Sequence, residues 1–291
     1  MKQKVSAVIT DLDNTLFDWV AIWHNSFKAM LDRLVEDSGI AREVLEAEIK
    51  QVFQRYGTSE YAFAIEELPS LRKQNPAEDL AKKYSAAIHA YNSARKATLC
   101  LYPTVLETLE TLKDHGCLIV GYTESMAYYS HYRLRKLALD RVLDFVYSPP
   151  DHELPKGLSR TKIRMYPEAA YQLRRTQSRN TPKGELKPNP KVLNDIIGSI
   201  GAVPEETIYI GDSLMKDIAM AQATHVVDVW AKYGAAQDRP EYELLRKVTH
   251  WPTKEVAREK ETTTAEIKPT FVLERSFSEL FIVDPGFQTR E

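Results

Sequence analysis

Short apolar runs alternate with stretches of helical periodicity along much of the chain, and this alternation predicts its architecture. Residues 5–10 form a β-branched run that predicts a first strand. Further along, the pattern predicts helix 103–115, strand 117–122, helix 125–138, strand 143–147, helix 190–199, strand 207–210, helix 214–223, strand 225–230 and a last strand and helix within 267–280. Strands that alternate with helices imply a parallel sheet covered by helices on both faces.

Residues 19–98 follow a different pattern, with apolar side chains three and four positions apart and no convincing strand. Amphipathic helices must bury their apolar faces against one another, so we expect a separate all-helical domain inserted after the first strand. The predicted fold class is therefore α/β. A Rossmann-like parallel-sheet core would comprise residues 1–18 and 99–291, and the helical domain would comprise residues 19–98.

Composition narrows the class of protein. The chain has 291 residues, of which 43% are hydrophobic, and its formal net charge is -2. This length allows a sizeable core, and the charge argues against a nucleic-acid or anionic-membrane partner. No apolar run approaches the ~18 residues of a membrane span. Cys100 and Cys117 have neither metal-ligand spacing nor a disulfide framework, which suits a reducing compartment, so we expect a cytoplasmic protein.

A basic segment interrupts the alternating pattern. Between residues 148 and 186 the chain has eight Lys or Arg against four acids. Such a segment could form a flap for an anionic substrate or a nucleic acid, but a solvated surface insertion at 151–186 is the simpler interpretation.

Acidic residues follow two of the predicted strands. Asp11 and Asp13 come directly after strand 5–10, and Asp212 and Asp217 follow strand 207–210. The carboxyl ends of parallel strands form the crevice in which α/β proteins bind ligands, so these carboxylates should gather there. One acid could attack a phosphate ester while another protonates the leaving oxygen. Carboxylates this close repel one another, and a divalent cation such as Mg²⁺ would relieve the repulsion.

Two further segments supply donors for a phosphoryl group. Thr123 follows the strand predicted at 117–122, and Lys187 lies in the sequence ELKPNP. A hydroxyl and an ammonium group can stabilise the charge that spreads over the transferring phosphoryl oxygens. The turn at 55–59, between two predicted helices of the inserted domain, could descend over the same site. The nearby Phe17, Trp19 and Trp23 could contact a substrate at the entrance of the inserted domain, but packing in the core is the simpler interpretation.

Along the chain, DLDNTL, Thr123, KPNP and GDSLMKD resemble, in this order, the four motifs of the haloacid dehalogenase superfamily. The helical insertion resembles the cap of a branch that includes phosphoglycolate phosphatases. The resemblance implies the following roles: Asp11 as nucleophile, Asp13 as general acid and base, Thr123 and Lys187 as phosphate binders, and Asp212 as a Mg²⁺ ligand. It also implies Asp217 as a ligand or orienting residue and the backbone carbonyl of Asp13 as a ligand.

The resemblance implies a Mg²⁺-dependent phosphatase that hydrolyses a small phosphorylated metabolite through an aspartyl-phosphate intermediate. Asp13 favours phosphoester hydrolysis, because relatives that displace halide carry another residue there. Glu124 departs from the family pattern and could either disfavour a highly charged substrate or point away. Three alternatives remain: a phosphosugar mutase, a phosphonate-cleaving enzyme with a Schiff-base lysine in the cap, and a non-catalytic protein that binds phosphate and Mg²⁺.

Overall fold

A seven-stranded parallel sheet forms the centre of the computed structural model, which describes residues 5–151, 154, 169, 171–252 and 267–283. The strands are β1 (Ala7–Thr10), β2 (Leu118–Tyr122), β3 (Phe145–Ser148), β4 (Gln177–Asn180), β5 (Thr207–Gly211), β6 (Val227–Ala231) and β7 (Phe271–Leu273). Their order across the sheet is β4-β3-β2-β1-β5-β6-β7. The predicted α/β fold is confirmed, and β1 lies at its centre, hydrogen-bonded to β2 and β5.

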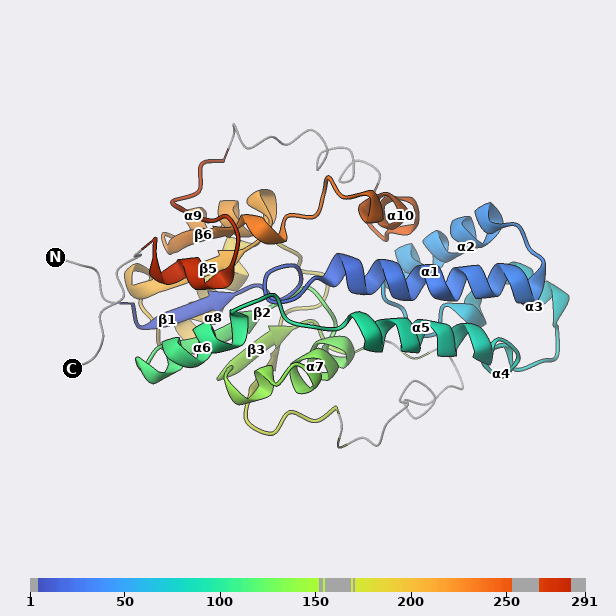
Figure 1. The fold of residues 1–291 in the computed structure, drawn as a ribbon, viewed down its shortest axis with the longest axis horizontal. Coiled ribbons are helices and arrows are strands. Elements are labelled where there is room, and N and C mark those ends of the chain that lie inside the picture. The colour runs from blue at the N-terminus through green and yellow to red at the C-terminus, as the bar shows by residue number, and fades with distance from the viewer. Residues whose placement is uncertain (1–4, 152–153, 155–168, 170, 253–266, 284–291) are drawn as a thin grey trace.

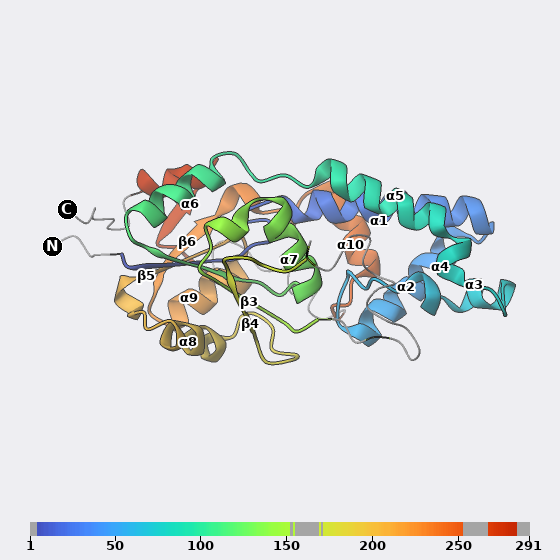
Figure 2. The ribbon, with the colours of Figure 1, turned by 90° about the horizontal axis from the view of Figure 1, so that it is seen from below.

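Helices cover both faces of the sheet (Figure 1, Figure 2). On one face, α6 (Val105–Asp114) and α7 (Ala127–Lys136) bury leucines against Val8 of β1. On the other face, α8 (Pro190–Ser199) and α9 (Ala219–Ala223) pack against Ile9. Successive residues of a strand point to opposite faces, so a continuous apolar run is what a strand buried on both faces requires.

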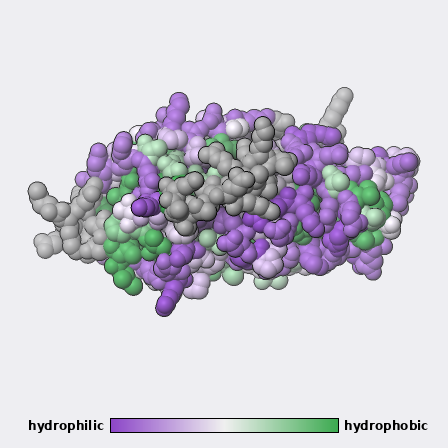
Figure 3. All heavy atoms as spheres, turned by 90° about the horizontal axis from the view of Figure 1, so that it is seen from above, coloured by the Kyte–Doolittle hydropathy of each residue, from purple (hydrophilic) through white to green (hydrophobic). Residues whose placement is uncertain are grey.

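Residues 19–98 form a helical domain at one end of the sheet domain, and we call it the cap (Figure 1). Its helices are α1 (Trp19–Ser38), α2 (Arg42–Tyr56), α3 (Pro69–Gln74), α4 (Leu80–Lys83) and α5 (Ser85–Thr98). They enclose an apolar cluster separate from the two clusters on the sheet faces. On the face drawn in Figure 3, hydrophilic side chains cover most of the described surface, with hydrophobic patches towards the two ends.

One helix after β6 packs on the cap. This helix, α10 (Pro240–Val248), buries Tyr242, Leu245 and Val248 in the apolar cluster of the cap. In Figure 1 it lies beside α1 and α2. The assignment of residues 99–291 to the sheet domain stays a prediction. The structure shows in addition that α10, which lies in this part of the chain, packs on the cap.

The predicted insertion at 151–186 contributes a strand that the sequence analysis did not anticipate. The strand β4 has the polar sequence QSRN and forms one edge of the sheet beside β3. Just before it, the carboxylate of Asp140 accepts hydrogen bonds from the backbone amides of residues 174–176. The guanidinium of Arg179 lies 4.3 Å from the ring centroid of Phe145. Much of the insertion, residues 152–153, 155–168 and 170, lies outside the described residues.

Within the described part of the chain, none of the helices combines the length and the apolar character that a membrane span needs.

Candidate active site

The carboxyl ends of β1 and β5 and the loop that precedes α8 meet at the edge of the sheet nearest the cap (Figure 1). A cavity of about 140 Å³ opens between them and the cap. Five of the six predicted site residues line this cavity: Asp11, Asp13, Lys187, Asp212 and Asp217. Parallel strands bring together residues that are as many as two hundred positions apart in the sequence.

Three carboxylates form the most acidic part of the cavity. Asp11, Asp212 and Asp217 each offer an oxygen atom, and these atoms lie within 4.8 Å of one another. Burial raises the pKa of Asp11 to about 8, and burial followed by the charge of Asp217 raises the pKa of Asp212 well above its usual range. Buried acids crowded in this way are stabilised by a divalent cation, and hard carboxylate oxygens are the ligands that Mg²⁺ prefers. The donor set therefore fits the predicted metal.

The backbone after β5 explains how Asp217 reaches this position. Residues Leu214–Ile218 form one turn of π-helix, where the sequence predicted a regular helix, and α9 begins only after it. A Cβ atom on Gly211 would lie 2.3 Å from the carboxyl carbon of Asp217. Only glycine leaves this space free, so Gly211 permits the close approach of Asp217 to the strand end.

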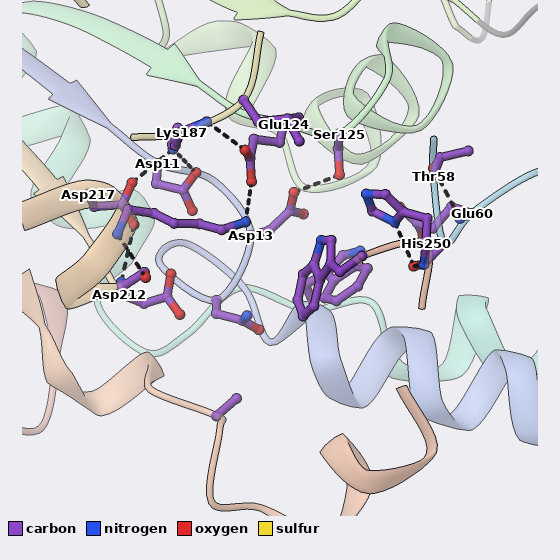
Figure 4. A pocket seen from close by; sticks show the side chains of 18 of the residues that line it. Asp11, Asp13, Thr58, Glu60, Glu124, Ser125, Lys187, Asp212, Asp217 and His250 are labelled. Carbon is purple, nitrogen blue, oxygen red and sulfur yellow. Dashed lines mark hydrogen bonds and ion pairs between the residues drawn. The ribbon is translucent and has the colours of Figure 1, made fainter. Parts of the chain in front are cut away.

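Lys187 supplies a buried cation between two of these acids. Its Nζ lies 2.5 Å from Asp11 Oδ1 and 2.9 Å from Asp217 Oδ1, and its side chain is only 2% exposed. The ring of Tyr122 lies below the ammonium group, and the hydroxyl of Tyr209 donates to Asp217. Figure 4 shows Lys187, Asp11 and Asp217 turned toward one another. This arrangement holds the ammonium group beside the carboxylate of Asp11.

The second acid of the DLD sequence is held by donors on its own side of the cavity. Oδ2 of Asp13 accepts hydrogen bonds from Thr123 Oγ1 at 3.0 Å and Ser125 Oγ at 2.6 Å. Thr123 is buried and does not line the cavity, so its role as a phosphate binder stays a prediction. Ser125 does line the cavity, and the sequence analysis did not single it out. Its position two residues after Thr123, in the loop after β2, could have indicated that it reaches the same cavity.

Glu124 has its charge compensated within the site. Its carboxylate accepts a hydrogen bond from the backbone amide of Lys187 at 2.7 Å and one from Lys216 Nζ at 2.7 Å. Although burial acts in the opposite direction, the neighbouring Lys216 lowers the pKa of Glu124. This departure from the family pattern therefore ties the loop after β2 to the loop that carries Lys187.

The cap and the segment around α10 form the remaining walls. Gly57–Glu60 line the cavity, which places the end of the predicted turn over the site. Trp19 lines it as well, whereas Trp23 is buried and donates to the carbonyl of Ser59 at 2.8 Å. From the other side come Tyr242, His250 and Trp251. Sequence reasoning missed these three, because no motif marks them.

Comparison with known proteins assigns this arrangement to a family. The model of the haloacid dehalogenase-like hydrolases matches residues 5–225, and a second model, of HAD-like hydrolases, matches residues 186–277. The chain belongs to the haloacid dehalogenase-like hydrolase family. A glyceraldehyde 3-phosphate phosphatase of Methanopyrus kandleri is 26% identical over 238 residues, which cover 80% of this chain and 87% of the relative. Together these findings confirm the expected class of enzyme, a phosphatase of this family.

Solved structures support the same fold. A 2-haloacid dehalogenase from Pseudomonas syringae is similar with a TM-score of 0.54 at 16% identity, covering 96% of this chain and 97% of that one. A putative HAD-hydrolase from Bacillus subtilis, bound to magnesium, is similar with a TM-score of 0.52 at 16% identity, covering 97% and 100%. At such low identity the similarity concerns the fold alone.

Proposed function

We propose that the protein is a Mg²⁺-dependent phosphatase that hydrolyses a small phosphorylated metabolite through an aspartyl-phosphate intermediate. The observation that carries the proposal is the position of Asp11, whose carboxylate contacts the ammonium group of Lys187 and lies within 4.8 Å of carboxylate oxygens of Asp212 and Asp217. A nucleophilic carboxylate needs positive charge around the phosphoryl group that it attacks, and Lys187 together with a metal ion held by these acids would supply it.

The side chains can divide the reaction into two steps. An oxygen of Asp11 attacks phosphorus, the ester P–O bond breaks, and the leaving oxygen takes a proton from Asp13. Asp13 then removes a proton from water, which attacks phosphorus, and the bond between phosphorus and Asp11 breaks. Lys187 and Thr123 would stabilise the phosphoryl oxygens. Asp11, Asp212, Asp217 and the backbone carbonyl of Asp13 would hold Mg²⁺, which neutralises charge on the phosphate and the acids.

The charges around the cavity favour an uncharged leaving group. Among the described residues that line it, six are acids, while the only lysines are Lys187 and Lys216. Both lysines are already paired, Lys187 with Asp11 and Lys216 with Glu124. A second anionic group on the substrate would find acids rather than a free cation, so a carboxylate such as that of phosphoglycolate is disfavoured. The indoles of Trp19 and Trp251 would instead contact a neutral carbon skeleton, and glyceraldehyde 3-phosphate, the substrate of the relative, has one.

The same cavity argues against one alternative. A phosphonate-cleaving enzyme needs a cap lysine at the reacting carbon, but Lys187 and Lys216 both come from outside the cap. Within the described chain, the cap residues Lys28 and Lys83 pair instead with the exposed acids Asp32 and Glu78.

The test is phosphate release from glyceraldehyde 3-phosphate, sugar phosphates, nucleotides and phosphoglycolate, measured with Mg²⁺ and with chelator. We expect metal-dependent release that is greatest for substrates with neutral leaving groups and that is lost in Asp11→Asn. Unchanged turnover in Asp11→Asn would overturn the nucleophile assignment. Release only in the presence of a sugar bisphosphate would favour the mutase, and Mg²⁺ binding without release would favour the non-catalytic protein.

A further inference from the structure

A buried arginine contacts the predicted general acid from a direction that no motif indicated. Arg133 lies on α7, and its side chain is only 2% exposed. Its Nη1 lies 3.3 Å from Asp13 Oδ1 and donates to Ser125 Oγ at 3.1 Å. Its Nη2 donates to Glu60 Oε1 in a very short contact. The guanidinium therefore joins an acid of the sheet domain to an acid of the cap.

This arrangement fixes Asp13 through both of its oxygens. Oδ1 faces Arg133, while Oδ2 accepts from Thr123 and Ser125. The ring of Tyr129 lies 5.6 Å from the guanidinium carbon. A planar guanidinium that is packed and hydrogen-bonded on two sides has little freedom to rotate, so it sets the orientation of the carboxyl group that it contacts.

Contacts of the cap fix the position of Glu60. Its backbone amide donates to Thr58 Oγ1 at 3.1 Å, and the preceding carbonyl, that of Ser59, accepts from the indole of Trp23 in α1. The hydroxyl of Ser59 lies 2.9 Å from Nδ1 of His250. The loop is thus anchored to α1 and to the segment after α10, and Glu60 is 7% exposed. Moving the cap away would separate Glu60 from Arg133.

Arg133 would be less stable in its buried position if it kept only one of its two acidic partners. Without Glu60, Nη2 of Arg133 would lose its acceptor and Asp13 alone would compensate the guanidinium charge, and breaking a buried ion pair is destabilising. Without Glu60, Arg133 would be drawn further toward Asp13, its remaining acid. The position of the Asp13 carboxyl therefore depends on a residue of the other domain.

We propose that Glu60 and Arg133 are positioning residues that act on the leaving group: Glu60 of the cap holds Arg133, and Arg133 holds Asp13 toward the ester oxygen. Proton donation by Asp13 is then effective only when the cap lies over the site. This inference rests on the proposed phosphatase function and on the assignment of Asp13 as its acid.

Two phosphate esters of similar size test the inference, because their leaving groups differ in how strongly they require protonation. Benzyl phosphate releases an alkoxide unless it is protonated, whereas 4-nitrophenyl phosphate releases a stable phenolate. In Glu60→Gln and Arg133→Met, we expect kcat/KM for benzyl phosphate to fall roughly tenfold to a hundredfold. For 4-nitrophenyl phosphate it should fall less than about threefold, because proton donation contributes little to that reaction. Arg133→Lys should recover part of the loss.

Controls separate this inference from the function on which it rests. Arg135 lies on the same helix and pairs with Asp140, away from the cavity, so Arg135→Met should leave the ratio of the two kcat/KM values unchanged. Asp13→Asn should show the largest leaving-group effect, and its absence would refute the acid assignment itself. If Asp13→Asn shows the effect but Glu60→Gln and Arg133→Met lose activity equally on both esters, Glu60 and Arg133 are merely structural and the inference fails. Glu60→Gln keeps the shape of the side chain, and circular dichroism would verify its fold.

Discussion

Replacing Lys187 by methionine would remove one charge from the centre of the site while keeping most of the side-chain volume. The ammonium group is 2.5 Å from Asp11 and 2.9 Å from Asp217, and all three side chains are at least nine-tenths buried. The variant would leave two buried carboxylates without the cation that they share. We therefore expect a loss of stability that depends strongly on whether a metal ion is present.

The expected size of the loss follows from the burial of the pair. Breaking a buried ion pair by removing one partner costs about 3–5 kcal/mol. For a domain of about this size, 1 kcal/mol corresponds to roughly 2–4 °C of melting temperature, so Lys187→Met should melt at least ~6 °C lower in chelator. Bound Mg²⁺ would compensate the charges of Asp11 and Asp217. Saturating Mg²⁺ should therefore recover at least about half of the loss.

Urea unfolding in chelator and in Mg²⁺ measures both quantities, with the slope of the transition checked for constancy. Lys191 provides the control, because its side chain is 82% exposed and it pairs with Asp195 one helical turn away. Lys191→Met should change stability by less than about 1 kcal/mol in either condition. A loss in Lys187→Met that is equally large with and without Mg²⁺ would refute the reasoning that the metal and the lysine compensate the same carboxylates.

Three further changes test other parts of the site. Asp212→Asn should raise the Mg²⁺ concentration for half-maximal activity at least ~10-fold, and an unaltered titration would count against its role as ligand. Gly211→Ala should reduce Mg²⁺-dependent turnover because its Cβ would collide with Asp217, whereas Gly198→Ala, which has open space around it, should not; equal activities would contradict the packing argument. Burial lowers the pKa of His250 to about 4. Because the unfolded chain takes up this proton near pH 6.5, the stability associated with the neutral His250 is present above pH 6.5 and is lost as the pH falls toward 4. His250→Gln should flatten this acid branch by an amount on the order of 3 kcal/mol in urea unfolding, and an unchanged branch would exclude His250 as its source.

The grouping of the acidic residues was predictable because it depends on strand ends. A buried strand is a continuous apolar run, and the first polar residue after it must lie at the edge of the sheet. Asp11 and Asp212 could be placed together on this basis without knowledge of any contact, whereas Lys187 follows no predicted strand and was placed by the resemblance of KPNP to a family motif. The position of the Asp217 side chain could not be predicted in this way, because the π-helical turn and the space at Gly211 that bring it to the strand end depend on close packing.

Three other features of the structure could not be predicted from the local sequence pattern. The strand β4 is polar along its whole length, because it lies at the edge of the sheet, and its hydrogen bonds to β3 do not require apolar residues. The pairing of Glu60 with Arg133 joins residues 73 positions apart on different domains. The helix α10 was overlooked because its apolar side chains match the surface of the cap, and a sequence pattern does not identify the partner of an amphipathic face.

The motif residues and the residues that would contact the leaving group come from different parts of the chain. The residues that we propose for the chemistry come from strand ends and loops outside the cap, and most of their positions follow from the topology of the sheet. The cavity walls that would surround the leaving group come from the cap loop ending at Glu60, from Trp19 and from the segment that carries Trp251. These walls are brought together by packing between α10 and the cap, so substitutions in that packing can reshape the leaving-group site without touching a catalytic residue. The substrate should therefore depend on contacts of α10 that are far from the four motifs, and proteins that share the motifs need not share a substrate.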